Sequence, residues 1–166
     1  MLFRSDLVAK YGSSLSPSQL IKVGGEVMAV AFMANSQHLY SRSDVLAAVG
    51  IDSIPTTYED VLAAAEAIRA AGIMEFPVAL NTMPGWNLGE EFLNMYMGTG
   101  ADLFVSGTAE VAINNEHGVA TLNMLKSLVA YSNPDFLTFD SNATQAEWEA
   151  GNLALAAMWG SRGGAI

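Results

Sequence analysis

The chain has 166 residues, enough for one domain with a sizeable hydrophobic core. Its net charge is −10, with only seven Lys and Arg residues, which argues against a nucleic acid as partner and against binding to an anionic membrane surface. It has no cysteine, which excludes disulfides and thiolate chemistry, and no apolar run approaches the roughly 20 residues that a membrane-spanning helix needs.

The first part of the chain predicts a helix followed by extended segments. Leu2–Tyr11 has the pattern of a short helix that ends near Gly12. Gly24-Gly25 predicts a tight turn, because two glycines allow the positive φ that such turns need. The apolar run Glu26–Phe32 then predicts a strand, and His38–Arg42 predicts another after a short polar interruption.

Two helices with recognisable ends follow. Ser43-Asp44 predicts the N-cap of a short helix, with Gly50 as its stop. Thr57 and Asp60 have the spacing of a capping box at the start of a longer helix, which Gly72 ends.

The central part of the chain predicts further alternation of strands and helices. Phe76–Leu80 predicts a buried strand, Asn81–Asn87 a loop and Leu88–Met97 a helix. Val111–Ile113 predicts a short strand, and Asn114-Asn115 is expected to cap a long helix over Glu116–Ser132. The apolar stripe of that helix consists of Val119, Leu122, Leu125 and Leu128.

The last elements complete an α/β pattern. Asn142 or Thr144 is expected to cap a helix that Gly151 ends, and Leu153–Trp159 predicts a final buried strand. Because strands alternate with helices along the chain, we expect a largely parallel sheet covered by helices.

Two predicted strand-to-helix loops carry tryptophan. Ligands of open α/β sheets bind beyond the carboxyl ends of the strands, where these loops lie. Trp86 is followed by Asn87, and Trp159 is followed by Ser161 and Arg162. An indole plane suits the apolar face of a sugar ring, and amide, hydroxyl or guanidinium groups suit its hydroxyls. We therefore expect these five residues to contact a ligand.

Each of these residues also has a structural interpretation. Trp159 ends a buried strand and could equally belong to the core, whereas Trp86 follows Pro-Gly, where a position facing a cleft is favoured. Trp148 lies in a predicted helix and is expected to be core. Arg162 could be a solvated residue at a helix start, although a cation there opposes the helix dipole.

The sequence predicts no catalytic residues, no metal ligands and no cofactor. Glu90 and Glu91 are adjacent on a predicted helix, so their side chains diverge by about 100° and cannot flank one bond. Glu59-Asp60 complements a helix dipole. His38 and His117 have no metal-binding or catalytic spacing.

Three segments resemble family 1 extracellular solute-binding proteins, the receptors of ABC importers. The family's first interlobe crossover is matched by Gly25, Ala34-Asn35, Leu39-Tyr40, Asp44-Val45 and Ala48–Ile51. Pro55–Val61 is similar to the family's P-x-T-W-D-E-L, and Glu147–Asn152 followed by Ala154–Met158 is similar to F-x-x-G-K-x-A-M. The sequence departs from the family at Ala31, where proline is common, and at Ser41-Arg42, which replaces Tyr-Asn.

The resemblance implies an incomplete three-layer α/β lobe of a periplasmic-binding-protein-like (type II) fold. Family members have two lobes and more than twice this length, so both ends look cut. Residues 1–34 would be a remnant of first-lobe elements and the crossover strand, and residues 35–166 a truncated second lobe. Asn35 and Ser36 align with a hinge segment that faces the cleft.

The resemblance further implies a substrate-binding component that holds a carbohydrate or polyol and works with an ABC permease. The protein would be periplasmic or lipid-anchored outside the cell, although this chain shows no signal peptide. An α/β structural or interaction module without a small ligand is the alternative, and a glycosidase a distant third. The apolar strand Val27–Phe32 further predicts self-association, because it would otherwise expose an uncharged edge.

Overall fold

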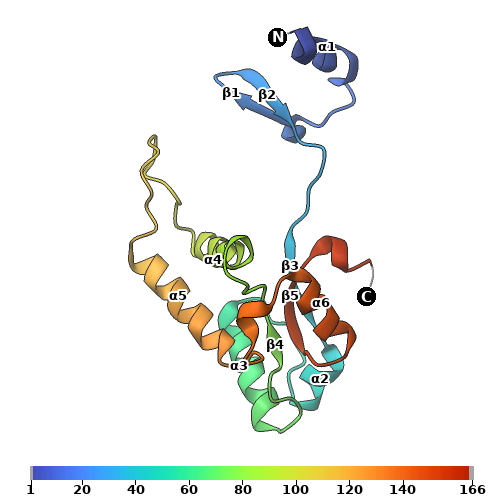
Figure 1. Cartoon of the computed structure of the whole chain (residues 1–166), viewed down its shortest axis with the longest axis vertical. Helices are drawn as coiled ribbons and strands as arrows, with labels where there is room; N and C mark the ends of the chain where they lie inside the picture. Colours follow the sequence, from blue (N-terminus) through green and yellow to red (C-terminus); the bar gives the residue numbers. More distant parts are fainter. Residues whose placement is uncertain (1, 165–166) are drawn as a thin grey trace. The chain divides into compact units, whose positions relative to one another are not determined.

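The computed structural model describes residues 2–164, with side chains from Asp6 onward. The chain divides into two units, Met1–Ser36 and Gln37–Ile166. Figure 1 labels the helices and strands of each unit along the chain.

The first unit is a helix and a β-hairpin. Its elements are α1 (Leu2–Tyr11), η1 (Pro17–Gln19), β1 (Leu20–Val23) and β2 (Glu26–Val30). The two strands pair antiparallel around the predicted glycine turn, in which Gly24 and Gly25 have φ of 58° and 81°. The predicted strand is two residues too long, because β2 ends at Val30. From Asp6 to Ser36 no side chain is buried, and Phe32 is 93% exposed.

The second unit is built on a three-stranded sheet. Its strands are β3 (Gln37–Ser41), β4 (Val78–Ala79) and β5 (Leu155–Trp159), in the order β3-β5-β4. β4 runs parallel to β5, but β3 runs antiparallel to it, so the expectation of a largely parallel sheet is wrong for one of the two pairings. The predicted strand over Phe76–Leu80 is also too long. Pro77 has no N–H to donate to a ladder, which explains why β4 begins only after it.

Helices cover both faces of this sheet, which gives three layers. On one face lie α2 (Ser43–Ala48), α3 (Tyr58–Ala70), α4 (Trp86–Gly98) and α5 (Glu116–Val129), and on the other lies α6 (Ser141–Glu149). The larger core lies under the four helices and includes Leu46, Val61, Ala65, Ile68, Met95, Leu128 and Leu155. The smaller core lies under α6 and includes Phe139, Leu153, Ala156 and Met158, with Tyr40 and Trp148 packed against it.

The helix caps confirm two of the sequence predictions and correct two others. The Thr57 hydroxyl accepts a hydrogen bond from Asp60 N–H at 3.1 Å, and the Asp60 carboxylate accepts one from Thr57 N–H at 3.1 Å, so the capping box is present. Asn115 caps α5. The N-cap position of α2 is Arg42, without a side-chain cap, rather than Ser43-Asp44. α6 is capped by Asp140, rather than by Asn142 or Thr144.

The stripe predicted along α5 is only half buried. Leu125 and Leu128 lie in the core, but Val119 and Leu122 are 58% and 54% exposed. The buried positions in the N-terminal half of α5 are instead Gly118 and Thr121, so the buried face there differs from the predicted stripe. The connection between α4 and α5 contains a single bridge between Phe104 and Val111, in place of the predicted strand at Val111–Ile113.

Candidate functional site

The carboxyl ends of β4 and β5 bring two predicted site residues together. The strands are parallel, so the segments that follow them leave the sheet at the same edge. There the indoles of Trp86 and Trp159 stack with their ring centroids 5.5 Å apart and their planes 19° from parallel. Trp86 is 63% exposed, whereas Trp159 is half-buried. Trp86 thus stays largely exposed while its ring stacks on Trp159; we call the two residues the tryptophan pair.

The segment around Trp86 differs from the predicted loop. Helix α4 begins at Trp86, after Gly85, whose φ of 103° sets the sharp entry to the helix. The helix therefore begins two residues earlier than predicted, and Trp86 lies in its first turn. Asn87 is buried in α4, at 9% exposure, and its contact with a ligand stays a prediction.

Arg162 is held by α6. Its guanidinium donates hydrogen bonds to Gln145 Oε1 at 2.7 Å, to Asn142 Oδ1 at 2.7 Å and to Ser141 Oγ at 3.0 Å. These contacts tie η3 (Gly160–Arg162), which follows Trp159, to the start of α6. Arg162 therefore has a structural role, which is to join η3 to α6, and the sequence did not indicate it. Ser161, in the same turn, is exposed.

The remaining predicted site residues lie in the first unit. Asn35 and Ser36 are exposed and precede β3 directly. Their position in a ligand cleft stays a prediction.

A buried carboxylate lies under the same edge of the sheet. Glu91 of α4 is 1% exposed, and its Oε1 accepts three hydrogen bonds: from Asn81 N–H at 2.9 Å, from Asn81 Nδ2 at 2.8 Å and from Gln37 Nε2 at 3.1 Å. Asn94 Nδ2 in turn donates to Gln37 Oε1. Asn81 Nδ2 also donates to Ala157 O of β5 at 3.2 Å. Glu91 thus joins the start of β3, the segment after β4, and α4.

Burial dominates the electrostatics of Glu91. It raises the pKa of the Glu91 carboxyl above its ordinary value, although the hydrogen bonds from Asn81 and Gln37 favour the charged form and oppose the rise. The neighbouring charge of Glu90 adds to the rise. The pKa of Tyr58 is also raised, first by burial and then by the charge of Glu91.

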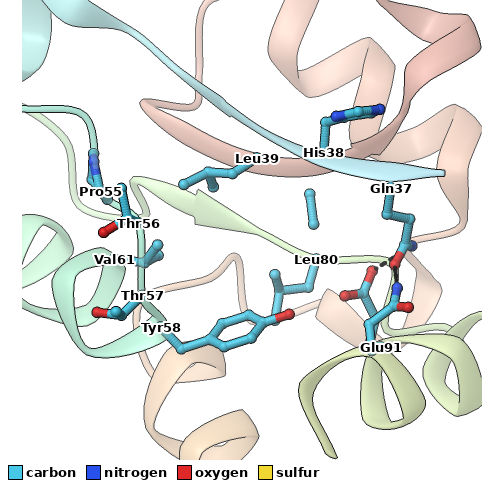
Figure 2. Close-up of a pocket in the computed structure, with 12 residues that line it drawn as sticks. Gln37, His38, Leu39, Pro55, Thr56, Thr57, Tyr58, Val61, Leu80 and Glu91 are labelled. Atoms are coloured by element: carbon cyan, nitrogen blue, oxygen red, sulfur yellow. Dashed lines mark hydrogen bonds between the residues drawn. The ribbon is translucent and has the colours of Figure 1, made fainter. Parts of the chain in front are cut away.

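Glu91 and Tyr58 line a pocket of about 370 Å³ in the second unit. Figure 2 shows the Tyr58 hydroxyl pointing toward the Glu91 carboxyl across this pocket. The remaining wall comes from β3, β5, the segment after β4, α4 and the start of α3: Gln37, His38, Leu39, Pro55, Thr56, Thr57, Val61, Leu80, Asn94 and Ala157. A mostly apolar pocket of this volume with a few converging polar groups has the usual character of a small-molecule site.

The pocket and the tryptophan pair share one face of the sheet. Gln37 pairs with Trp159, and Leu39 pairs with Ala157, across the antiparallel ladder of β3 and β5. Directly opposed residues carry their side chains on the same face. Gln37, which bonds to Glu91, is therefore the cross-strand neighbour of Trp159.

The sequence interpretation overlooked Glu91. The argument that adjacent carboxylates cannot flank one bond holds for Glu90 and Glu91, but it does not address a single buried acid. The signal was present in the helical period, because Asn87, Glu91 and Met95 are four residues apart and all lie on the buried side of α4.

Within residues 6–164, whose side chains the structure describes, no group of three or more His, Asp or Glu side chains is arranged to hold a metal ion. No helix in that range has both the length and the apolar character needed to cross a bilayer.

The sequence profile of one family matches nearly the whole chain. It is described as bacterial extracellular solute-binding protein, and the match runs over residues 4–165. This chain belongs to the bacterial extracellular solute-binding proteins. A relative from Deinococcus radiodurans, described as a probable ABC transporter-binding protein, is 25% identical over 142 residues; the match covers 82% of this chain and 34% of the relative.

Solved structures show that the fold is that of periplasmic binding proteins. The maltose-bound MalE3 of T. maritima has a TM-score of 0.81 at 20% identity over 95% of this chain and 41% of its own. An ABC transporter solute-binding protein of Agrobacterium radiobacter, in complex with ribitol, has a TM-score of 0.78 at 20% identity. The match covers 93% of this chain and 41% of that protein. A sugar transporter protein of Arthrobacter chlorophenolicus, with bound laminaribiose, has a TM-score of 0.76 at 16% identity. The match covers 93% of this chain and 41% of that protein. The chain thus spans about two fifths of these structures.

Proposed function

We propose that the chain is part of the substrate-binding component of an ABC importer and that it binds a carbohydrate or a related polyol. The tryptophan pair carries this proposal. A stacked and exposed indole at the carboxyl ends of parallel strands is the surface on which the apolar face of a sugar ring packs well. Family membership and the sugars and polyol named for the similar structures support this chemistry.

In this proposal the partner and the location are inferred from family membership. The complete protein acts outside the cytoplasm, in the periplasm or at the outer face of the cell membrane, and delivers its ligand to an ABC permease. Its mechanism is a ligand-dependent shift between conformations that the permease distinguishes. Binding, rather than catalysis, is the role of the site.

Calorimetric titration of the chain with maltose, ribitol, laminaribiose and glucose tests the proposal. At least one of these probes is expected to bind, and Trp86→Ala is expected to weaken that binding by about 1–3 kcal/mol through loss of apolar contact. Phe104→Ala is the matched control, because Phe104 is an aromatic side chain of similar exposure (51%) in the α4–α5 connection. Equal losses in both variants would contradict the role of Trp86. Absence of binding to the whole panel would favour the alternative, an α/β interaction module without a small ligand.

We also propose that the chain self-associates through its first unit, which we interpret as the remnant of a first lobe. The hairpin buries no side chain, and its apolar residues remain exposed: Ile21 at 50%, Val23 at 65% and Met28 at 58%. Apolar surface of this kind gains free energy when a second copy covers it. Light scattering at micromolar concentration should give a mass above that of the monomer. A monomer mass across the concentration range would contradict this proposal.

A further inference from the structure

The charges around the pocket select among the ligand classes that the proposed function leaves open. Sugars, polyols and sugar acids differ in charge more than in shape, so a binding site discriminates among them through the charged groups that it offers. The chain offers very few cations: seven Lys and Arg residues stand against seventeen Asp and Glu residues.

Among the residues that the structure describes, no Lys or Arg lines the pocket. Its lining residues include one acid, Glu91, and neither Lys nor Arg. His38 is the remaining titratable side chain besides Tyr58. Figure 2 shows its imidazole on the opposite side of β3 from Gln37, as the alternation of side chains along a strand requires. When Glu91 is ionised, a carboxylate brought into this pocket would therefore meet a like charge, with no Lys or Arg in the lining to offset it.

The cation nearest to the tryptophan pair along the chain is already engaged. Arg162 follows Trp159 by three residues, and a sugar acid would need such a guanidinium for a bidentate contact. Its guanidinium instead donates three hydrogen bonds to side chains of α6, and its positive charge contributes to lowering the pKa of Asp140. Binding an anion through Arg162 would require these bonds to break.

Glu91 is also poorly disposed to bind a cation. Its Oε1 already accepts three hydrogen bonds, and the carboxyl is almost completely buried. An ammonium group paired with it would lose its hydration, and a buried ion pair recovers that loss only with further hydrogen bonds. A hydroxyl group meets no such cost, because it carries no charge and can donate to or accept from the Tyr58 hydroxyl.

We infer that the pocket between β3, α3 and α4 is a binding site for an uncharged, hydroxyl-rich ligand or ligand portion, and that Glu91 is the residue that rejects anionic analogues. The inference rests on the proposed function, because it names which members of the carbohydrate class the chain accepts. In this inference Glu91 acts on a ligand in the pocket through its charge, because its side chain lines the pocket but is only 1% exposed.

The inference predicts a particular dependence on pH. An anion beside Glu91 must either face its charge or bind together with a proton, so the affinity for an anion should fall as pH rises through the pKa of Glu91. The affinity for a neutral sugar should change much less. The titratable groups around Glu91 are Tyr58 on α3, Glu90 on α4 and His38 on β3, whereas β5 contributes the carbonyl of Ala157 and the segment after β4 contributes Asn81.

Matched ligands of equal size test the inference on the 166-residue chain. Glucose is compared with glucuronate and glucosamine, and ribitol with ribonate, by calorimetric titration from pH 4 to 9. Where Glu91 is ionised, the neutral member of each set that binds should bind about tenfold or more tightly than its anionic analogue, in line with a like-charge interaction at an effective dielectric constant of 20 or somewhat higher. Glu91→Gln should reduce this ratio at least several-fold and remove its pH dependence.

Glu90→Gln is the control for net charge, because it also removes one negative charge from α4 but from a side chain that is only half-buried. It should leave the ratio nearly unchanged where Glu91 is ionised and shift its pH dependence to lower pH, because the charge of Glu90 adds to the rise in the pKa of Glu91. If neutral sugars bind through Trp86 but glucuronate binds equally well, or if the two glutamine variants behave alike, the inference is wrong and the proposed function stands. Tighter binding of glucosamine than of glucose would also overturn it, in favour of a cationic ligand. If no probe binds, the proposed function itself fails.

Discussion

Replacing Glu91 with glutamine should change how the stability of the second unit depends on pH. Glutamine keeps the shape of the side chain and one carbonyl oxygen, which can accept the hydrogen bonds from Asn81 and Gln37 that Oε1 accepts now. It removes the ionisable group. The comparison therefore separates the charge of Glu91 from its role as an acceptor.

The direction in which the stability difference between Glu91→Gln and the wild type changes with pH follows from the pKa of Glu91. Folding raises this pKa above the ordinary value of 4.5. The folded state binds this proton more tightly than the unfolded state, so the contribution of Glu91 to stability is complete below the unfolded pKa and is lost as pH rises through the folded pKa. Each unit by which folding raises the pKa corresponds to about 1.4 kcal/mol. The free energy of unfolding of Glu91→Gln should accordingly increase relative to the wild type above pH 4.5 and then reach a plateau.

Urea unfolding followed by tryptophan fluorescence from pH 4 to 8 measures this difference. All three tryptophans, Trp86, Trp148 and Trp159, lie in the second unit, so the signal reports on that unit. Carboxylates with lowered pKa values, such as Asp140, act in the opposite direction but are common to both proteins and cancel in the difference.

A second variant measures how much the hydrogen bonds to Glu91 contribute to the free energy of unfolding. Glu91→Ala leaves the buried N–H of Asn81 without its acceptor, which should cost about 1–3 kcal/mol even at pH 4, in addition to the cost of the space left empty. A difference between wild type and Glu91→Gln that is independent of pH, or one that falls as pH rises, would refute the reasoning about burial.

Three further predictions concern the framework of the site. Thr57→Ala removes the capping hydroxyl of α3 and should lower the free energy of unfolding by about 1 kcal/mol in urea titrations; an unchanged midpoint would contradict the capping role. A Cβ at Gly118 would lie 2.1 Å from Ile113 O, so Gly118→Ala should destabilise by about 1–3 kcal/mol, whereas Gly89→Ala, with no atom within 4 Å of the new Cβ, should stabilise by about 0.5–1 kcal/mol. Gly118→Ala as stable as Gly89→Ala would show that the contact relaxes freely. Arg162→Ala should lower stability through the lost bonds to α6 but leave the affinity for a neutral sugar unchanged, and a calorimetric loss of affinity at unchanged stability would show that Arg162 contacts ligand.

The parts of the fold that depend on neighbouring residues could be predicted from the sequence. The capping box at Thr57, the N-cap at Asn115 and the glycine turn at Gly24-Gly25 are each decided by a few adjacent residues, and all three are present. Element boundaries were less accurate where backbone geometry intervenes, as at Gly85, which starts α4 earlier than its apolar pattern indicates.

The arrangement of distant segments was not accessible in the same way. Arg162 bonds to side chains 17–21 residues away, and the sequence offers no sign of that pairing. The antiparallel direction of β3 is set by its pairing with the distant strand β5, and the residues of β3 alone do not encode it. The burial of Glu91 depends on β3, the segment after β4, and α4 meeting at one point, although its place on the apolar face of α4 was a usable signal.

The most direct test of the central claim is a nuclear Overhauser measurement between sugar and indole protons. With the best-bound probe of the maltose, ribitol, laminaribiose and glucose panel, the account predicts cross-peaks from sugar C–H protons to the ring protons of Trp86, the exposed member of the stacked pair. Trp148, which packs against Tyr40 on the α6 side of the sheet, should give none. A bound sugar with cross-peaks to Trp148 and none to Trp86 would contradict the account.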